Sequence, residues 1–471
     1  MANSNTDLKE ALYKRQLDNR TIREEVLLTS KDGTSPDRSS ATNVRDILAG
    51  SKYTRYRFQK NEFNNSILIS SDKGKTYKPL TNDDIDRIRA EIETYWKYTP
   101  NKDALTTGVN LTAMMNPINP VKDRIKSVIK WDGIPRAETF FIDYLGVKDE
   151  PYSRQVTKNW FKGLIARVYE PGVKFEVVPI LMGAQGIGKS TLVSLLIPEY
   201  FTDQVNSLDA SKKDELLKIG RVAIVELAEL NGLNTVANQG ALKAMISARN
   251  DLYRPPYGRV TEEVPRHTVF IGTTNDNQFL VDQTGNRRYF PLQCNKNNAT
   301  KKIPAPDDYK NDEILQVLAE ARELYLTNRD LKLPDEIVKI AMERQQSAMI
   351  IDPDIERIKD YANMQVPDEW NEYDLFRRKL YYDHYQLTGR CSRFDGKTEY
   401  TYKTDELHQI QAVATMEVLY TVFDIKNTRT NRGNTYSKKI SLALGDNLGE
   451  WVSSTNVNIL GKNKRGYKRV K

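Results

Sequence analysis

Short apolar runs alternate with helical patterns in the middle of the chain, between residues 175 and 300. Each run is long enough for one buried strand and carries β-branched side chains, as in FEVVPILM, RVAIV and TVFIG. Segments with helical spacing separate these runs, which is typical of a parallel sheet whose crossover connections are helices. The sequence therefore predicts an α/β domain at the centre of the chain.

The flanking regions follow other patterns. Apolar stripes predict helices within 121–170 and near 311–327 and 334–351. KYTRYRF alternates like a strand, and TNDDIDRIRAEIETYW (81–96) has helical spacing behind an Asn82 cap. We expect five parts: an N-terminal arm with a small mixed α+β domain (1–118), a helical collar (119–174), the α/β core (175–300), a helical lid or linker (301–365) and a basic C-terminal domain (366–471).

The C-terminal domain combines a helical pattern with positive charge. One helix is expected from Thr415 to Phe423, a second from Tyr436 to Leu448, and a strand-turn-strand wing over 451–470, which together predict a winged helix-turn-helix. Residues 426–471 hold eleven Lys and Arg but only two Asp and Glu. This surface is expected to contact DNA, with a merely solvated basic face as the alternative. The candidate contacts are Lys438, Lys439, Lys462, Lys464, Arg465 and Lys468.

Composition narrows the class of protein. Hydrophobic residues make up 39% of the 471 residues and charged residues 28%, and no apolar run approaches the roughly 18 to 20 residues of a membrane span. The N-terminal residues lack the apolar core of a signal peptide, and two cysteines allow no disulfide framework. We expect a cytoplasmic protein in which oxygen ligands hold any metal.

A glycine-rich stretch follows the first run of the α/β core. GAQGIGKS matches G-x-x-x-x-G-K-[ST] at every fixed position, with a strand before it and a helix after it. Backbone N–H groups of such a loop, next to a helix N-terminus, bind the phosphates of a nucleotide, here ATP. Lys189 is expected on the β and γ phosphates, Ser190 on Mg²⁺ and Thr191 near the α phosphate. The nucleotide-binding residues are therefore Gly183, Gln185, Gly186, Ile187, Gly188, Lys189, Ser190 and Thr191.

A phosphate loop needs carboxylates that hold Mg²⁺ and orient the attacking water. RVAIVELAEL supplies two of them. Glu226 is expected at the end of a buried strand, as the acid that acts with Ser190 on the metal. Glu229 is the candidate base for water; the alternative is a cap or salt-bridge role, because two residues separate the acids.

Three further polar residues follow the strand TVFIGTTN. Asn275 ends this strand and is expected to hydrogen-bond the γ phosphate or the lytic water. Arg287 and Arg288 come after a glycine turn, where an arginine can neutralise transition-state charge on a neighbouring subunit's nucleotide. We expect one of the two in that role and the other in an internal salt bridge.

A hairpin is expected around Pro255 and Pro256, between the strands RVAIV and TVFIGTTN. It presents cations and aromatic rings, which suit the grip of a single DNA strand in the pore of a ring. The alternative is a hairpin that only supports the nucleotide pocket. The residues proposed for DNA contact are Lys243, Arg254, Tyr257 and Arg259.

These segments resemble the virulence-associated protein E family of phages and mobile islands, which is placed among superfamily 3 type AAA+ helicases. The resemblance covers roughly residues 120–300 and rests on WDG, GAQGIGKST, VELAEL, YRPPYGR, PRHTVFIGTTN and TGNRRYFP. It implies an AAA+ P-loop NTPase core and ATP-driven unwinding of DNA by a hexameric ring with 3′ to 5′ movement. With its basic tail, the chain is similar to the replication initiator helicases of staphylococcal pathogenicity islands.

Two other functions fit the same motifs. An origin-binding DNA switch would use ATP only to control its assembly, without strand separation. A P-loop phosphotransferase would act on a small molecule, but it has no evident need of the arginine pair or of the cationic hairpin. The sequence thus favours an ATP-dependent DNA helicase and replication initiator that forms a homo-oligomer and binds single- and double-stranded DNA.

Overall fold

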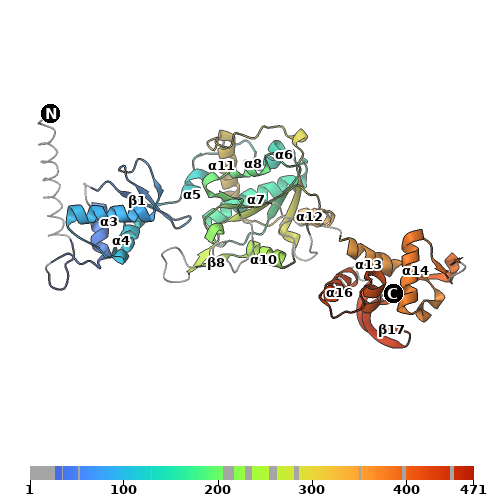
Figure 1. Cartoon of the computed structure of the whole chain (residues 1–471). Helices are drawn as coiled ribbons and strands as arrows, with labels where there is room; N and C mark the ends of the chain where they lie inside the picture. Colours follow the sequence, from blue (N-terminus) through green and yellow to red (C-terminus); the bar gives the residue numbers. More distant parts are fainter. Residues whose placement is uncertain are drawn as a thin grey trace. The chain divides into compact units, whose positions relative to one another are not determined.

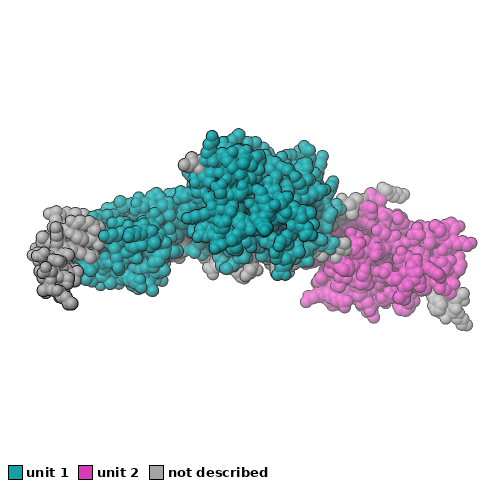
Figure 2. All heavy atoms as spheres, turned by 90° about the horizontal axis from the view of Figure 1, so that it is seen from above, with its two compact units in different colours: residues 1–349 teal, residues 350–471 magenta. Residues whose placement is uncertain are grey.

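The computed structural model describes residues 27–33, 35–50, 54–128, 130–204, 217–228, 236–253, 262–280, 286–349, 352–394, 399–445 and 450–470. The chain divides into two compact units, residues 1–349 and 350–471, which Figure 2 colours separately. No helix in the described part of the chain has the length and apolar character needed to cross a membrane.

The first unit begins with a small α+β region. Its elements are α2 (Ala41–Gly50), β1 (Arg57–Asn61), β2 (Ile67–Ser70), β3 (Lys78–Pro79), α3 (Asn82–Trp96), α4 (Lys102–Met114) and β4 (Pro117–Ile118). The strands form one sheet in the order β3-β2-β1-β4, and buried Ile88, Ile92 and Trp96 of α3 help to form the core of this region. The N-cap of α3 is Thr81, in a capping box with Asp84, so the prediction of Asn82 as the cap was wrong by one residue. A cap at Thr81 is favoured over one at Asn82 because the Thr81–Asp84 capping box provides acceptors for two backbone N–H groups.

The rest of the first unit is an α/β structure around a five-stranded sheet (Figure 1). Its helices are α5 (Pro120–Ile125), α6 (Phe140–Leu145), α7 (Pro151–Tyr169), α8 (Lys189–Ser194), α10 (Val236–Ser247), α11 (Asp312–Thr327) and α12 (Asp335–Ser347). Its strands are β5 (Val178–Met182), β6 (Phe201–Thr202), β7 (Ile224–Ala228), β8 (Asn250–Tyr253), β9 (Glu262–Pro265), β10 (Val269–Thr274) and β11 (Tyr289–Gln293).

The five-stranded sheet has the order β11-β5-β10-β7-β6, and every neighbouring pair is parallel. The predicted α/β core with a parallel sheet is confirmed. Because β10 lies between β5 and β7, the carboxyl ends of these three strands meet at one edge of the sheet. The glycine-rich loop follows β5 at that edge.

Alternate residues of the strands face two different cores. Leu181 of β5 and Ile224 of β7 belong to a cluster that includes α7 and α11, whereas Ile180 and Val225 pack with α10. Helices therefore cover both faces of the sheet, which explains why these strands read as continuous apolar runs. Trp160 of α7 is fully buried and donates its indole N–H to the carbonyl of Phe270 on β10 at 2.8 Å.

The second unit combines helices with short strands. Its elements are α13 (Pro353–Asn363), β12 (Gln365–Pro367), α14 (Leu375–Thr388), β13 (Ser392–Phe394), β14 (Glu399–Thr401), β15 (Leu407–Gln409), β16 (Ala412–Ala414), α15 (Thr415–Phe423), α16 (Asn431–Leu444), β17 (Trp451–Ile459) and β18 (Lys462–Arg469). The unit begins at residue 350 rather than at the expected 366, because Ile358 and Tyr361 of α13 lie in its core.

The last five elements follow the predicted order of two helices and a strand-turn-strand wing. Helix α15 has the predicted ends, and β17 and β18 form a hairpin that joins β16 in a three-stranded sheet. Helix α16 starts five residues before the predicted Tyr436, because the Thr430 hydroxyl accepts from the Gly433 N–H and caps it there. It ends at Leu444, and the predicted end, Leu448, lies outside the described residues.

Candidate functional site

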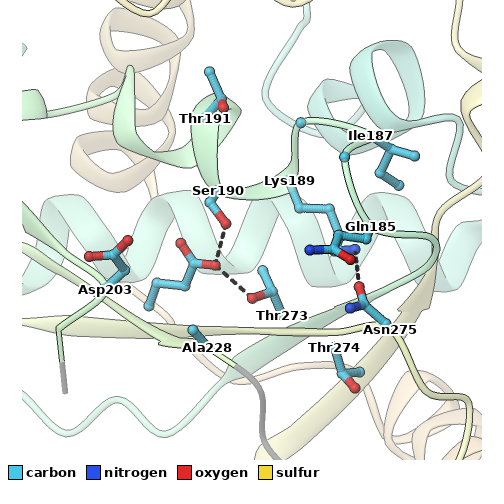
Figure 3. Close-up of a pocket in the computed structure, with 13 residues that line it drawn as sticks. Gln185, Ile187, Lys189, Ser190, Thr191, Asp203, Ala228, Thr273, Thr274 and Asn275 are labelled. Atoms are coloured by element: carbon cyan, nitrogen blue, oxygen red, sulfur yellow. Dashed lines mark hydrogen bonds between the residues drawn. The ribbon is translucent and has the colours of Figure 1, made fainter. Parts of the chain in front are cut away.

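The glycine-rich loop lines a pocket of about 280 Å³ at the carboxyl edge of the five-stranded sheet (Figure 3). The lining residues are Gln185, Gly186, Ile187, Gly188, Lys189, Ser190, Thr191, Asp203, Glu226, Ala228, Thr273, Thr274 and Asn275. Seven of the eight residues predicted for nucleotide binding are among them. Gly183 is behind the lining, where its carbonyl accepts a hydrogen bond from Lys189 Nζ at 2.6 Å.

Lys189 begins α8 and is buried, with 7% of its surface exposed. Its ammonium donates to the carbonyls of Gly183 and Ala184 and to Asn275 Oδ1, the last at 3.2 Å. Burial lowers the pKa of Lys189. The structure thus brings together two predicted residues that are 86 positions apart in the chain, because β5 and β10 are neighbours in the sheet.

Glu226 lies within β7 rather than at its end, and its side chain is fully buried. Its Oε1 atom accepts hydrogen bonds from Ser190 Oγ and Thr273 Oγ1, each at 2.6 Å. Its Oε2 atom is also buried and has no hydrogen-bond partner among the described residues. Burial raises the pKa of this carboxyl group. A buried carboxylate oxygen without a partner is energetically unfavourable unless a cation or an ordered water compensates it.

Two structural features explain why glycines occupy this loop, namely backbone conformation and lack of room for a Cβ atom. Gly186 and Gly188 have φ of 80° and 92°, in the left-handed region where other residues are strained. A Cβ atom on Gly188 would lie 2.4 Å from Ile303, and one on Gly183 would lie 2.8 Å from the Cys294 carbonyl. At Gly183 and Gly188 the neighbouring protein atoms therefore leave no room for a side chain.

Asp203 and Thr273 line the pocket but were not predicted from the sequence. Asp203 directly follows β6 on the Ser190 side of the pocket, where its charge contributes to the raised pKa of Glu226 (Figure 3). Little in the sequence indicated Asp203, because the preceding strand β6 has only two residues and both are half-buried, so no apolar run marks it. Glu229, predicted as the second acid, lies outside the described residues.

The two predicted arginines occupy different environments on the short 3-10 helix Asn286–Arg288. Arg288 is half-buried, donates to Ser247 Oγ at 2.8 Å and forms an ion pair with Glu176 at 3.3 Å. Arg287 is exposed and forms no hydrogen bond or ion pair with another described residue. Arg288 thus has the internal role and Arg287 is the one available to another molecule.

Strands β8 and β9 form the hairpin expected around the proline pair. A buried ion pair between Arg266 and Asp251 fixes its base, with Arg266 Nε 2.8 Å from Asp251 Oδ2. Lys243 is on α10 and is half-buried. The other three residues predicted for DNA contact in this hairpin, Arg254, Tyr257 and Arg259, lie outside the described residues.

The six basic residues of the second unit that were predicted to contact DNA lie in three different environments. Lys439 of α16 is not available for DNA, because it pairs with Asp352 at 2.8 Å and with Asp354 at 2.6 Å. Lys438 is exposed on the same helix, and Arg465 and Lys468 are exposed on β18. The remaining two, Lys462 and Lys464, line a groove described below.

The fold and this pocket fit an α/β nucleotide-binding core. Residues 125–350 match the family model of the virulence-associated protein E-like domain. The expected resemblance is thus confirmed as a domain match, and it extends past residue 300 to include α11 and α12.

The similarity to solved structures is more distant. The apo structure of the NrS-1 C terminal region is 14% identical, with a TM-score of 0.48, and the match covers 92% of this chain and 100% of that chain. Its A form apo structure gives 14% identity, a TM-score of 0.46 and the same coverage. A comparison with curated proteins gives no match.

Proposed function

We propose that the chain is an ATP hydrolase of the AAA+ type that unwinds DNA as a ring-shaped oligomer, in the replication of a phage-related mobile element. One observation carries the proposal. Lys189, Ser190, Glu226 and Asn275 converge on one pocket, the first two from the start of α8 after β5, Glu226 from β7 and Asn275 from just after β10. The domain match over residues 125–350 supports the assignment to the family of these replication proteins.

The side chains of the pocket divide the chemistry among them. Lys189 would exchange its two loop carbonyls for phosphate oxygens, because an ammonium group prefers an anion to a neutral acceptor. Asn275, already within reach of Lys189, would orient the attacking water. Glu229 is proposed as the base for this water, and Asp203 is the described carboxylate best placed to take that role instead.

Ser190 and Glu226 fit a Mg²⁺ ion that accompanies the nucleotide. The buried Oε2 atom of Glu226 has no described partner, and the hydroxyl of Ser190 is 2.6 Å from the Oε1 atom of the same carboxylate. Hydroxyl and carboxylate oxygens are the ligands that Mg²⁺ prefers, directly or through its waters. When bound, Mg²⁺ neutralises part of the phosphate charge.

Arg287 and the second unit extend the proposal to the assembly and to DNA. Arg287 would stabilise the transition state in the site of a neighbouring subunit, most simply in a hexamer, since it is exposed and forms no hydrogen bond or ion pair with another described residue. The order β16, α15, α16, β17, β18 is that of a winged helix-turn-helix. In this arrangement Lys438, Arg465 and Lys468 would contact the phosphates of duplex DNA at an origin, while the β8–β9 hairpin would grip a single strand.

The test combines ATP hydrolysis with strand separation. The full chain is expected to hydrolyse ATP faster with single-stranded DNA and to unwind a forked duplex. Lys189→Ala should lose both activities and stay folded, while Lys148→Ala, at a 79% exposed site of the same unit, should keep them. Hydrolysis without unwinding of any fork would favour the DNA switch, and normal hydrolysis by folded Lys189→Ala would refute the assigned phosphate site.

A further inference from the structure

A second cavity of about 580 Å³ lies entirely within the second unit, between the start of α14, α15 and the turn of the wing. We call it the wing groove. Its lining residues are Asp374, Leu375, Phe376, Met416, Tyr420, Lys426, Ile459, Leu460, Lys462 and Lys464. None of them contributes to the nucleotide pocket, so the groove is independent of the proposed hydrolase site.

Large apolar side chains are left exposed along this groove. The exposed fraction is 58% for Phe376, 52% for Leu460 and 37% for Met416. Single exposed apolar residues are ordinary on a protein surface, but several that line one cavity indicate an interaction site. The groove thus offers a floor that an apolar side chain can cover.

The turn of the wing places Leu460 at the groove in an unfavourable backbone conformation. Leu460 has φ of 46° and is followed by Gly461 at φ of 75°. Hairpin turns of this kind favour Asn, Asp or Gly at both positions, because a leucine in the left-handed region brings its Cβ close to the following carbonyl. An apolar side chain kept here at a cost in backbone energy supports a role for the leucine itself.

Positive charge surrounds the apolar floor. Lys426, Lys462 and Lys464 are exposed and form no ion pair with another described residue. The groove has one acid, Asp374, whose carboxylate accepts the backbone N–H of Arg377 at 2.8 Å as the cap of α14 and is outnumbered by the three lysines. Three free cations around an apolar cavity are complementary to carboxylates that flank a large apolar side chain.

From this complementarity we infer that the wing groove binds an acidic peptide segment of a partner protein that inserts a Leu or Phe side chain. Duplex DNA matches only half of the surface, because its phosphates can pair with the lysines but leave Phe376, Met416 and Leu460 uncovered. Arg465 and Lys468, which are exposed and do not line the groove, remain available for DNA while the groove is filled. The segment could therefore bind while the second unit is on DNA.

The experiment measures fluorescence anisotropy of a labelled twelve-residue peptide of Glu, Leu and Phe with the full chain. A peptide with Lys for every Glu and an all-Glu peptide of the same length serve as comparison probes. Phe376→Ser should weaken binding about tenfold, as for an apolar anchor, and Lys462→Glu with Lys464→Glu by a similar factor. Leu387→Ser, 86% exposed on the same helix, and Lys403→Glu, at an exposed site of the same unit, are the matched controls and should bind normally.

A second readout locates the peptide. Methyl-labelled methionine spectra should show a shift for Met416, assigned with Met416→Leu, and none for buried Met364 of the same unit. No binding at millimolar peptide, equal binding of the Lys-substituted peptide, or equal losses in the control variants would each overturn the inference. If Phe376→Ser weakens binding of a labelled 20-base-pair DNA duplex but not binding of the peptide, the groove binds nucleic acid and the inference is wrong.

Discussion

Protonation of His267 should destabilise the first unit, and the structure gives the size of the effect. His267 lies in the segment between β9 and β10. It is 7% exposed, and its ring lies against Phe63, with 4.0 Å between the ring centroids. Burial lowers its pKa to about 4, and the nearby Arg167 and Arg266 act in the same direction. Asp251 and a hydrogen bond with the backbone of Gly220 oppose the shift but do not cancel it.

The consequence for stability follows from proton linkage. An unfolded chain binds a proton at this histidine below its ordinary pKa of about 6.5, whereas the folded chain binds it only below about 4. The free energy of unfolding is therefore unaffected above pH 6.5 and falls as the pH decreases from 6.5 to 4. Two protonation equilibria with these pKa values give a loss of about 2 kcal/mol at pH 5 and roughly 3 kcal/mol at lower pH.

The measurement compares urea unfolding of the full chain at pH 7.5 and pH 5. Hydrogen exchange of peptides from β10 reports the first unit separately from the second. His267→Asn removes the titration, so its free energy of unfolding should fall by about 2 kcal/mol less than that of the natural chain between the two pH values. His408→Asn, at a 39% exposed site of the second unit, is the control. Parallel pH curves for the natural chain and His267→Asn would refute the reasoning.

Four other predictions concern the hydrolase and the second unit. Glu226→Gln should retain nucleotide binding but lose Mg²⁺-dependent hydrolysis; normal turnover would exclude Glu226 as the metal acid. Arg287→Ala should reduce hydrolysis by on the order of 10³-fold without destabilising the chain, and mixing it with Lys189→Ala should restore part of the activity. Arg288→Ala should instead lower stability by about 1 kcal/mol, through its lost ion pair and hydrogen bond. A chain that ends at residue 349 should hydrolyse ATP normally but lose origin DNA in a competition footprint, and retained selection would place recognition in the first unit.

Local patterns predicted the phosphate loop well. The apolar run before the glycines and the fixed positions of the motif lie within one continuous segment, so no knowledge of distant contacts was needed. Asn275 and Lys189 were both expected at the nucleotide phosphates, and their side chains are hydrogen-bonded in the structure, because both follow strands and parallel strands end at the same edge of a sheet.

The misses have a common physical origin in distant partners. Lys439 follows a helical pattern and looks available for DNA, but its partners Asp352 and Asp354 lie in a different helix and its cap, more than eighty positions away. Thr273 belongs to an apolar run, and its contact with Glu226 depends on the pairing of β10 with β7. The division of the wing cations between the groove and the open surface depends in the same way on packing against α14 and α15.

The buried connection between β9 and β10 rigidly joins the β8–β9 hairpin to the strand that ends at the nucleotide pocket. The three residues that join the strands, Arg266, His267 and Thr268, are all buried, and Thr268 Oγ1 is held between the carbonyls of Ile219 and Val222. Strand β10 itself is clamped on both edges, by β5 and by β7. A displacement of the carboxyl end of β10, beside the pocket residue Asn275, is therefore expected to move the hairpin as well.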